Sequence, residues 1–560
     1  PPDRQCERVV DRLRDAIKPI VVDRRPFVDV DRAVPLGEWA VGETEAPSRR
    51  GLFNEPVDPR GLELLKDFLV DQVLIDHTCH NVHCDPTGEY SGLKVTIRER
   101  SLTPPPTLPR VLCLVGEPTR ESRGSVMSES LLVRGGKSLS GSITPSGNKN
   151  AVLPMLCATL LTDETMMVRN VPDITDVNKI VDFFETLGSQ VEWDRGAKTI
   201  AINHGGADLN SRTVIDSLPP GMRSSVMLFG PLLARVGTLN VTDDATGCSL
   251  GAREVDPHLD ILEGFGAAIE WGDRREIRLP GGFSANEHWL DYASVTTTEH
   301  FVMCAALANG TSTLVNAASE PHVQDLCAVL IEMGAKIDGI GTSVLTVEGV
   351  SALTGADVHV SDDHHEIFTF LAIGAMTGGD VSVEHSVQHH FPLMDRTLEK
   401  FGVEVERTAT GSRVSTTDRL RVEQPRTSHL MQKVEGAPWP YFPVDLIPPV
   451  VALATVADGD MLFWNKVYEG AFGWVPELAK FGAQVTVCDP HRIIVFGRDD
   501  LRPAVVDAPY IIRVTIALFM VGATIDGESI IRNASPVRRA HPNFVENLRS
   551  LGADVEWVTE

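Results

Sequence analysis

One short stretch gathers most of the side chains that covalent chemistry uses. Residues 245–258 read Ala-Thr-Gly-Cys-Ser-Leu-Gly-Ala-Arg-Glu-Val-Asp-Pro-His. The glycines on either side of Cys248 disfavour helix and strand, so a loop is predicted there. Arg253 follows, and Asp256 and His258 open a predicted helix. A thiol near a fixed positive charge and a helix start can have a lowered pKa and react, although a glycine-rich turn with an incidental cysteine is the simpler interpretation of this stretch by itself.

Further reactive side chains stand at the starts of predicted apolar helices. The helices near residues 303–309 and 451–457 are apolar on nearly every face, which predicts that they are buried. A core needs no charges, and an unpaired buried charge is strongly destabilising. Because helix N-termini attract anions, the cations of this set predict a phosphate or carboxylate pocket, with ordinary N-caps and surface charges as the alternative. The set comprises Lys149, Asn150, Arg223, Ser294 to Thr298, Glu366, Asp445 and Arg513.

The elements that must position these side chains recur along the chain. Six times, a predicted helix ends in an apolar residue and a glycine and is followed by a strand. Glycine supplies the left-handed conformation that ends a helix. Six such units, with helices inside and sheets outside, predict two pseudo-symmetric α/β domains of three units each. The glycines are Gly188, Gly266, Gly334, Gly402, Gly482 and Gly552.

Length, charge and cysteine usage limit the class of protein. The 560 residues are too many for one core. The formal charge of 51 − 77 = −26 argues against nucleic-acid or membrane-surface binding, so an anionic substrate needs a local basic pocket. No apolar run approaches the roughly 20 residues of a membrane span, and the first residues do not resemble a signal peptide. With nine scattered cysteines, these features predict a cytoplasmic protein with reduced thiols.

Residues 1–128 differ in character from the rest and form an N-terminal extension to which the sequence assigns no function. The segment from His77 to Cys84 reads His-Thr-Cys-His-Asn-Val-His-Cys, and zinc prefers these ligand types. Its spacing fits no standard zinc finger, so an ordinary polar turn is the favoured interpretation and a metal site is the alternative.

The remaining chain resembles the enolpyruvyl transferases, most closely the branch that acts on UDP-N-acetylglucosamine. The resemblance covers about residues 131–560 and implies a pair of inside-out α/β barrels. One domain would be residues 149–361 with the Cys248 lid loop, and the other residues 129–148 with 362–560. The motifs that carry the resemblance are Ser146-Gly-Asn-Lys-Asn-Ala-Val-Leu-Pro154, Gly221-Met-Arg-Ser-Ser225, the Cys248 loop, Glu320-Pro, Pro443-Val-Asp445 and Val475-Pro-Glu-Leu478.

The resemblance implies transfer of the enolpyruvyl (1-carboxyvinyl) group of phosphoenolpyruvate to a hydroxyl of a uridine nucleotide, with release of phosphate. Protonation of the methylene carbon makes a cationic centre that a hydroxyl attacks, so the site needs an acid, a base and cations. By the resemblance, Asp445 takes the hydroxyl proton, and Cys248 donates a proton, holds phosphoenolpyruvate covalently or aids product release. These two small molecules are the expected partners, and no cofactor or metal ion is expected.

The resemblance also assigns binding roles. Those for phosphoenolpyruvate fall on Lys149, Arg253, Arg513 and Arg539. Those for the acceptor and its nucleotide fall on Asn150, Asp256, His258, Ser294 and Val295, with Arg253 continuing into this region. The remaining substrate-binding positions are Arg223, Glu320 and Glu366.

Departures from the family pattern concentrate on the acceptor half. Tyr292 stands where a basic residue precedes Ser294, Ala471 and His364 replace arginines, and Ile511 replaces an aspartate. The 3′-hydroxyl of UMP, in nucleoside-antibiotic biosynthesis, therefore remains an alternative acceptor. An inactive nucleotide-binding scaffold and a metal-dependent enzyme centred on residues 77–84 also remain open, and the oligomeric state is not predicted.

Overall fold

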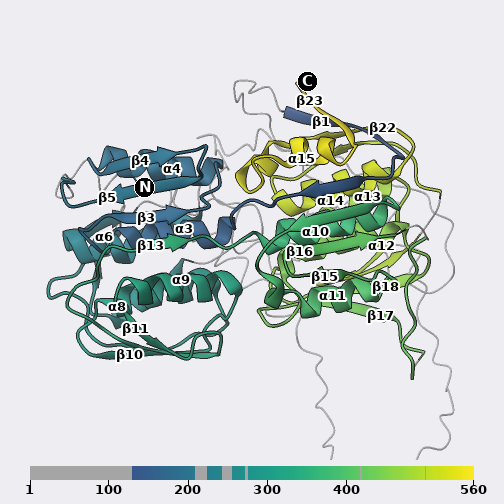
Figure 1. Cartoon of the computed structure of the whole chain (residues 1–560). Coiled ribbons are helices and arrows are strands. Elements are labelled where there is room, and N and C mark those ends of the chain that lie inside the picture. The colour runs from purple at the N-terminus through teal and green to yellow at the C-terminus, as the bar shows by residue number, and fades with distance from the viewer. Residues whose placement is uncertain are drawn as a thin grey trace, which may run out of the picture. The chain divides into compact units, whose positions relative to one another are not determined.

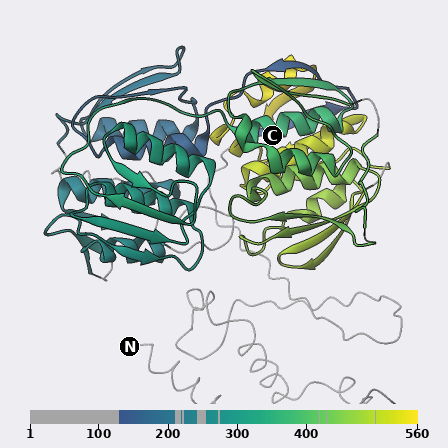
Figure 2. The ribbon, with the colours of Figure 1, turned by 60° about the horizontal axis from the view of Figure 1, so that its bottom comes forward.

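The computed structural model describes residues 129–559, except 209–217, 219–222, 242–254, 271–274, 417–418, 428 and 498–499. Buried apolar side chains form two clusters within these residues. The first core is built from residues 151–360, and the second core from residues 131–143 and 367–555. In each core the helices are flanked by strands (Figures 1 and 2).

Three sheets belong to the first core. Their strands, in spatial order, are β13 (Asp357–His359), β3 (Met166–Arg169), β5 (Thr199–Asn203) and β4 (Gln190–Asp194); β6 (Thr238–Val241), β8 (Arg275–Arg278) and β7 (Ala268–Glu270); and β11 (Lys336–Asp338), β12 (Val344–Glu348), β10 (Thr311–Val315) and β9 (Glu287–Trp289).

Three further sheets belong to the second core. Their strands are β21 (Val505–Asp507), β22 (Gly527–Arg532), β1 (Glu129–Gly135) and β23 (Asp554–Thr559); β15 (Glu406–Thr408), β16 (Gly411–Ser415), β14 (Asp380–Glu384) and β2 (Ser140–Ile143); and β17 (Gln432–Gly436), β18 (Asp460–Asn465), β20 (Arg492–Phe496) and β19 (Gln484–Asp489). Thus β1 and β2 precede the first core in sequence but pair within the second.

One pairing pattern recurs in all five four-stranded sheets. Each has one parallel pair at an edge, such as β13 with β3 or β21 with β22, and two antiparallel pairs. None of the sheets formed by the described strands closes on itself. The fold is therefore mixed α/β, and the arrangement as six repeats in two inside-out barrels stays a prediction, as do the domain boundaries.

The helices that carry the expected site residues are buried on nearly every face, as their composition predicts. All residues of α10 (His364–Met376) are buried, as are Thr297–Ala306 of α8 (Val295–Ala306). The other helices of the first core are α3 (Lys149–Thr159), α4 (Thr175–Thr186), η1 (Arg223–Leu228), α6 (Phe229–Val236), α7 (Asp256–Gly264) and α9 (Pro321–Glu332). Those of the second core are η3 (Gln388–His390), α11 (Pro392–Glu399), η4 (Val444–Leu446), α12 (Ile447–Val456), α13 (Val475–Lys480), α14 (Ile512–Thr524), η5 (Ser535–Arg539) and α15 (Phe544–Ser550).

The glycines that were predicted to end six helices all adopt the left-handed conformation. Their φ angles lie between 74° and 104°, where a side chain would be strained. The six helix–glycine–strand junctions predicted from the sequence are therefore confirmed.

Two connecting segments run side by side between the cores. Asn148 N–H donates to Ser361 O at 2.8 Å, and Asp363 N–H donates to Ser146 O at 2.9 Å. This pairing places the start of α3 and the start of α10 next to one another. No helix among the described residues is long and apolar enough to cross a membrane.

Candidate active site

Two basic side chains, one from each core, meet at the buried carboxylate of Asp176 in α4. Lys149 Nζ lies 2.7 Å from Asp176 Oδ2, and Arg539 Nε and Nη2 donate to the two carboxylate oxygens at 3.2 and 3.1 Å. Asn148 caps α3 by accepting the Asn150 N–H at 2.8 Å, which fixes Lys149 in the first turn. We call the three cations Lys149, Arg539 and Arg513, together with the carboxylate of Asp176, the cation group.

Burial and charge act in opposite directions within the cation group. Burial lowers the pKa of Lys149, Asp176 raises it, and Arg539 and Arg513 lower it further. Burial raises the pKa of Asp176, but Lys149 and Arg539 outweigh burial and hold that pKa below its usual range. Two cations thus act on one ionised carboxylate, and Arg513 acts on Lys149 from nearby, so the group offers cations that a phosphate or carboxylate ligand can bind.

Arg513 connects the cation group to Asp445. Arg513 is in the first turn of α14, with Nη1 against His541 Nε2 and Nη2 4.0 Å from Asp363 Oδ2. Arg513 and Asp445 line one pocket of about 30 Å³, together with Asn465 and Tyr468. That volume holds about one water molecule, so this pocket by itself encloses no larger ligand.

Two glutamates expected at the site are held by backbone N–H groups. Glu320, the N-cap of α9, accepts from Trp439 N–H at 3.1 Å, while burial and the nearby Asp445 raise its pKa. Glu366, in the first turn of α10, accepts from Ser146 N–H at 2.6 Å. Both contacts tie the two cores or their connecting segments together, so these glutamates have a positioning role independent of any ligand.

The residues expected at the nucleotide lie at the starts of α7 and α8. His258 is buried, with Nδ1 3.2 Å from His300 Nδ1 and Nε2 3.2 Å from Thr296 Oγ1. Ser294 caps α8 next to Val295, and its Oγ is 2.7 Å from Thr297 Oγ1. Asp256 is exposed at the first position of α7. These two helix starts are thus in contact with each other through His258.

Three of the predicted site residues cannot be placed by their side chains. Cys248 and Arg253 lie outside the described residues, and so does the segment from His77 to Cys84. Arg223 begins η1, but only its backbone is described. The predicted roles of these residues stay predictions.

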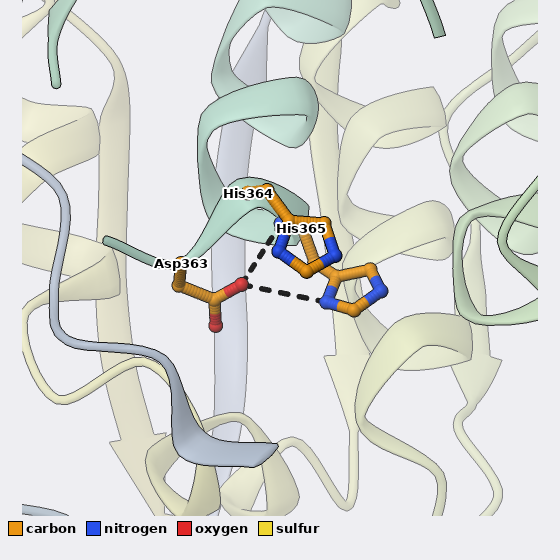
Figure 3. Close-up of side chains that lie close together, drawn as sticks. All are labelled: Asp363, His364 and His365. Atoms are coloured by element: carbon orange, nitrogen blue, oxygen red, sulfur yellow. Dashed lines mark hydrogen bonds and ion pairs between the residues drawn. The ribbon is translucent and has the colours of Figure 1, made fainter. Parts of the chain in front are cut away.

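A second buried cluster, absent from the predicted site residues, stands at the start of α10. The side chains of Asp363, His364 and His365 lie together there (Figure 3), and we call them the junction triad. Asp363 Oδ1 caps α10 by accepting the N–H groups of His365 and Glu366 at 2.8 and 3.2 Å. His365 Nδ1 is 3.5 Å from the same oxygen.

Four residues of this region escaped sequence reasoning for identifiable reasons. Asp176 and His541 are in motifs with no spacing signal, and they join the site only through contacts between distant segments. Asp363 and His365 flank His364, which the sequence marks as a departure from the family pattern. The consecutive pair of histidines at the start of an apolar helix was the available signal.

Residues 133–548 match the family model described as EPSP synthase (3-phosphoshikimate 1-carboxyvinyltransferase). The UDP-N-acetylglucosamine 1-carboxyvinyltransferase of Borreliella burgdorferi is 35% identical over 431 residues, which cover 77% of this chain and 99% of the relative. The protein of the same name from Bradyrhizobium diazoefficiens is 34% identical over 429 residues, covering 77% and 98%.

Two solved structures share the fold. The enolpyruvyl transferase NikO from Streptomyces tendae superposes with a TM-score of 0.68 at 21% identity and covers 78% of this chain and 100% of its own. EPSP synthase from Acinetobacter baumannii gives a TM-score of 0.59 at 17% identity, covering 77% and 100%. At these identities the likeness concerns the fold alone.

Proposed function

The chain belongs to the EPSP synthase family and is an enolpyruvyl transferase, and on this premise we propose that it transfers the carboxyvinyl group of phosphoenolpyruvate to a hydroxyl of UDP-N-acetylglucosamine. The observation that carries the proposal is the cation group, which concentrates positive charge in a chain of net charge −26. The relatives named above, which match nearly their whole length, support UDP-N-acetylglucosamine as the acceptor.

The proposed binding mode follows from the charges. Lys149, Arg513 and Arg539 hold the phosphate and carboxylate of phosphoenolpyruvate, and Arg253 joins them from the Cys248 loop. Asn150 contacts the acceptor, and His258, Ser294 and Val295 line the nucleotide region with Asp256. Within this scheme the two cores are the two domains of the family fold, each an inside-out α/β barrel.

The proposed reaction has two stages. A proton is added to the methylene carbon of phosphoenolpyruvate, with Cys248 as the candidate donor, while the acceptor oxygen bonds to the adjacent carbon and its proton passes to Asp445. The tetrahedral adduct then loses phosphate and one methyl proton, which restores the vinyl group. Cations beside the phosphate stabilise the negative charge that develops on it as it leaves.

An Asp445→Asn variant tests this assignment. Asparagine has nearly the same shape but does not accept a proton near neutral pH, so phosphate release is expected to fall by about 100-fold or more. Phosphoenolpyruvate binding, measured by calorimetry, is expected to change little. The matched control is Asp460→Asn at the exposed start of β18, which should retain full activity. A near-normal rate for Asp445→Asn would remove Asp445 as the base.

UMP is the second candidate acceptor, and Tyr292 favours it. Tyr292 is half exposed and precedes Ser294, so the start of α8 offers an aromatic ring where a diphosphate would favour a cation. Phosphate release from phosphoenolpyruvate, measured separately with UDP-N-acetylglucosamine and with UMP, distinguishes the two acceptors. Release with neither acceptor would contradict both proposed acceptors and leave another acceptor or the inactive scaffold.

A further inference from the structure

The junction triad brings together three side chains of the types that bind transition metals. One ligand atom from each of Asp363, His364 and His365 lies within 4.8 Å of the other two, and all three residues are buried. Figure 3 shows the carboxylate and both imidazole rings projecting from the start of α10 into one space. Two imidazoles and one carboxylate form a ligand set that suits zinc and iron(II).

Several polar atoms at this place lack hydrogen bonds. Among the described residues, Asp363 Oδ2, His365 Nδ1 and the Nδ1 of nearby His322 in α9 have no hydrogen-bond partner. A buried polar atom without a partner costs about 1–3 kcal/mol, so several such atoms in one location indicate a site that a ligand completes. His322 interacts electrostatically with both Asp363 and His365.

The surrounding residues orient the proposed ligands. Asp363 Oδ1 is held by two backbone N–H groups, which fix the direction of the carboxylate, and Oδ2 has no hydrogen bond but lies 4.0 Å from Arg513 Nη2. His364 Nδ1 lies 3.2 Å from Asn148 Nδ2, a long contact that fixes the ring and could be exchanged for a metal bond. Hydrogen bonds of this kind around ligands set their orientation in metal sites.

The local charge balance permits a divalent cation. Asp363 and Glu366 contribute two carboxylates to the first turn of α10, and Arg513 Nη2 at 4.0 Å from Asp363 Oδ2 opposes a cation. For bonds of about 2.1 Å to a tetrahedral ion, the ligand atoms must lie roughly 3.4 Å apart, so they have to move closer together when the ion binds.

We propose that Asp363, His364 and His365 bind one divalent first-row transition-metal ion. The ion would lie at the start of α10, where the two connecting segments pair through Asn148 with Ser361 and Ser146 with Asp363. This proposal does not depend on which acceptor the protein uses. It departs from the expectation, drawn from the sequence, that no metal ion is present.

Zinc stoichiometry in the full chain tests the proposal. Because His77 to Cys84 is a second candidate site, the background carries Cys79→Ser and Cys84→Ser. After chelator treatment, reloading with Zn²⁺ and dialysis, one equivalent of zinc is expected in this background. Substitution of Co²⁺ should give visible d–d absorption without a thiolate charge-transfer band, since the triad contains no cysteine. An unloaded background protein would overturn the proposal.

Matched variants assign the bound ion to the triad. His365→Ala is expected to weaken zinc binding by at least about 100-fold, because loss of a ligand exceeds the effect of losing an outer hydrogen bond. His359→Ala, at an exposed position in β13, should bind as tightly as the background. If His365→Ala fails to fold, His365→Cys keeps a ligand and should bind Co²⁺ with a new thiolate band. Unchanged binding in His365→Ala, or no such band in His365→Cys, would overturn the assignment.

Discussion

Asp176 and Asp363 are both buried carboxylates near the junction of the two cores, but they are satisfied in different ways. Both oxygens of Asp176 are bonded to cations, namely Lys149 and Arg539. One oxygen of Asp363 caps α10, and the other has no hydrogen bond among the described residues. The first carboxylate holds cations in place before a substrate arrives, whereas the second belongs to a cluster that is incomplete without a ligand.

Lowering the pH from 7 to 5 should have the largest effect on the free energy of unfolding. The effect should come from buried histidines and not from the two buried carboxylates. Burial lowers the pKa of His204 and of His300 to about 3, so both stay neutral in the folded protein, while the unfolded chain takes up protons below about 6.5. The stability that depends on each neutral histidine is complete above pH 6.5 and is lost as the pH falls towards the pKa of that histidine in the folded protein. By pH 5, each histidine is expected to lower the free energy of unfolding of the protein by about 2 kcal/mol.

Asp176 and Asp363, whose pKa values lie below the usual range, remain ionised in both conditions. Urea unfolding at pH 7 and pH 5 measures the effect. His204→Gln should reduce the pH dependence, and His359→Gln at an exposed position should leave it unchanged. Equal urea midpoints at the two pH values would contradict the prediction.

Asp176→Ala should have the next largest effect, because it leaves Lys149 and Arg539 facing each other without a counter-charge. Removing one partner of a buried ion pair costs about 3–5 kcal/mol, and the partial exposure of both cations places the expected loss near about 3 kcal/mol. Urea unfolding measures it. The control is Asp357→Ala, whose pair with Arg169 is exposed and should contribute less than about 1 kcal/mol. Equal losses of unfolding free energy in Asp176→Ala and Asp357→Ala would show that the cation group is as exposed to solvent as a surface ion pair.

Asp363→Asn should have the smallest effect. Asparagine caps a helix about as well as aspartate, so only the charge opposite Arg513 and His365 is lost, and metal-free protein should lose about 1 kcal/mol. Asp363→Ala also loses the cap and should cost about 1 kcal/mol more. The pair of variants, compared by urea unfolding after chelator treatment, separates the capping role from the charge. Indistinguishable variants would mean that the cap contributes nothing.

Local signals made the repeated elements predictable. A glycine after an apolar helix end needs only its own backbone conformation, and all six such positions adopt it. Helix starts likewise located Lys149 and Arg513, because a charge at the start of an apolar helix is unusual in any environment. These features depend on residues a few positions apart.

Features that depend on distant segments were not predictable. Asp176 meets Arg539 across 363 residues, and His541 meets Arg513 only because η5 and α14 pack together. Neither Asp176 nor His541 belongs to a sequence pattern that predicts its distant partner. The departures at Tyr292 and His364 were visible in the sequence, but the contact between His364 and Asn148 became visible only in the fold.

The pairing of β1 within the second core has a consequence for synthesis on the ribosome. Leu131 of β1 pairs with Ile531 of β22, 400 residues later (531 − 131). At about 5–20 residues per second, this apolar strand waits roughly 20–80 s for its partner. The first core, whose strands all lie between residues 166 and 359, can be completed during that interval. The nascent chain therefore carries an unpaired strand next to a finished core, a state in which chaperone binding protects it from aggregation.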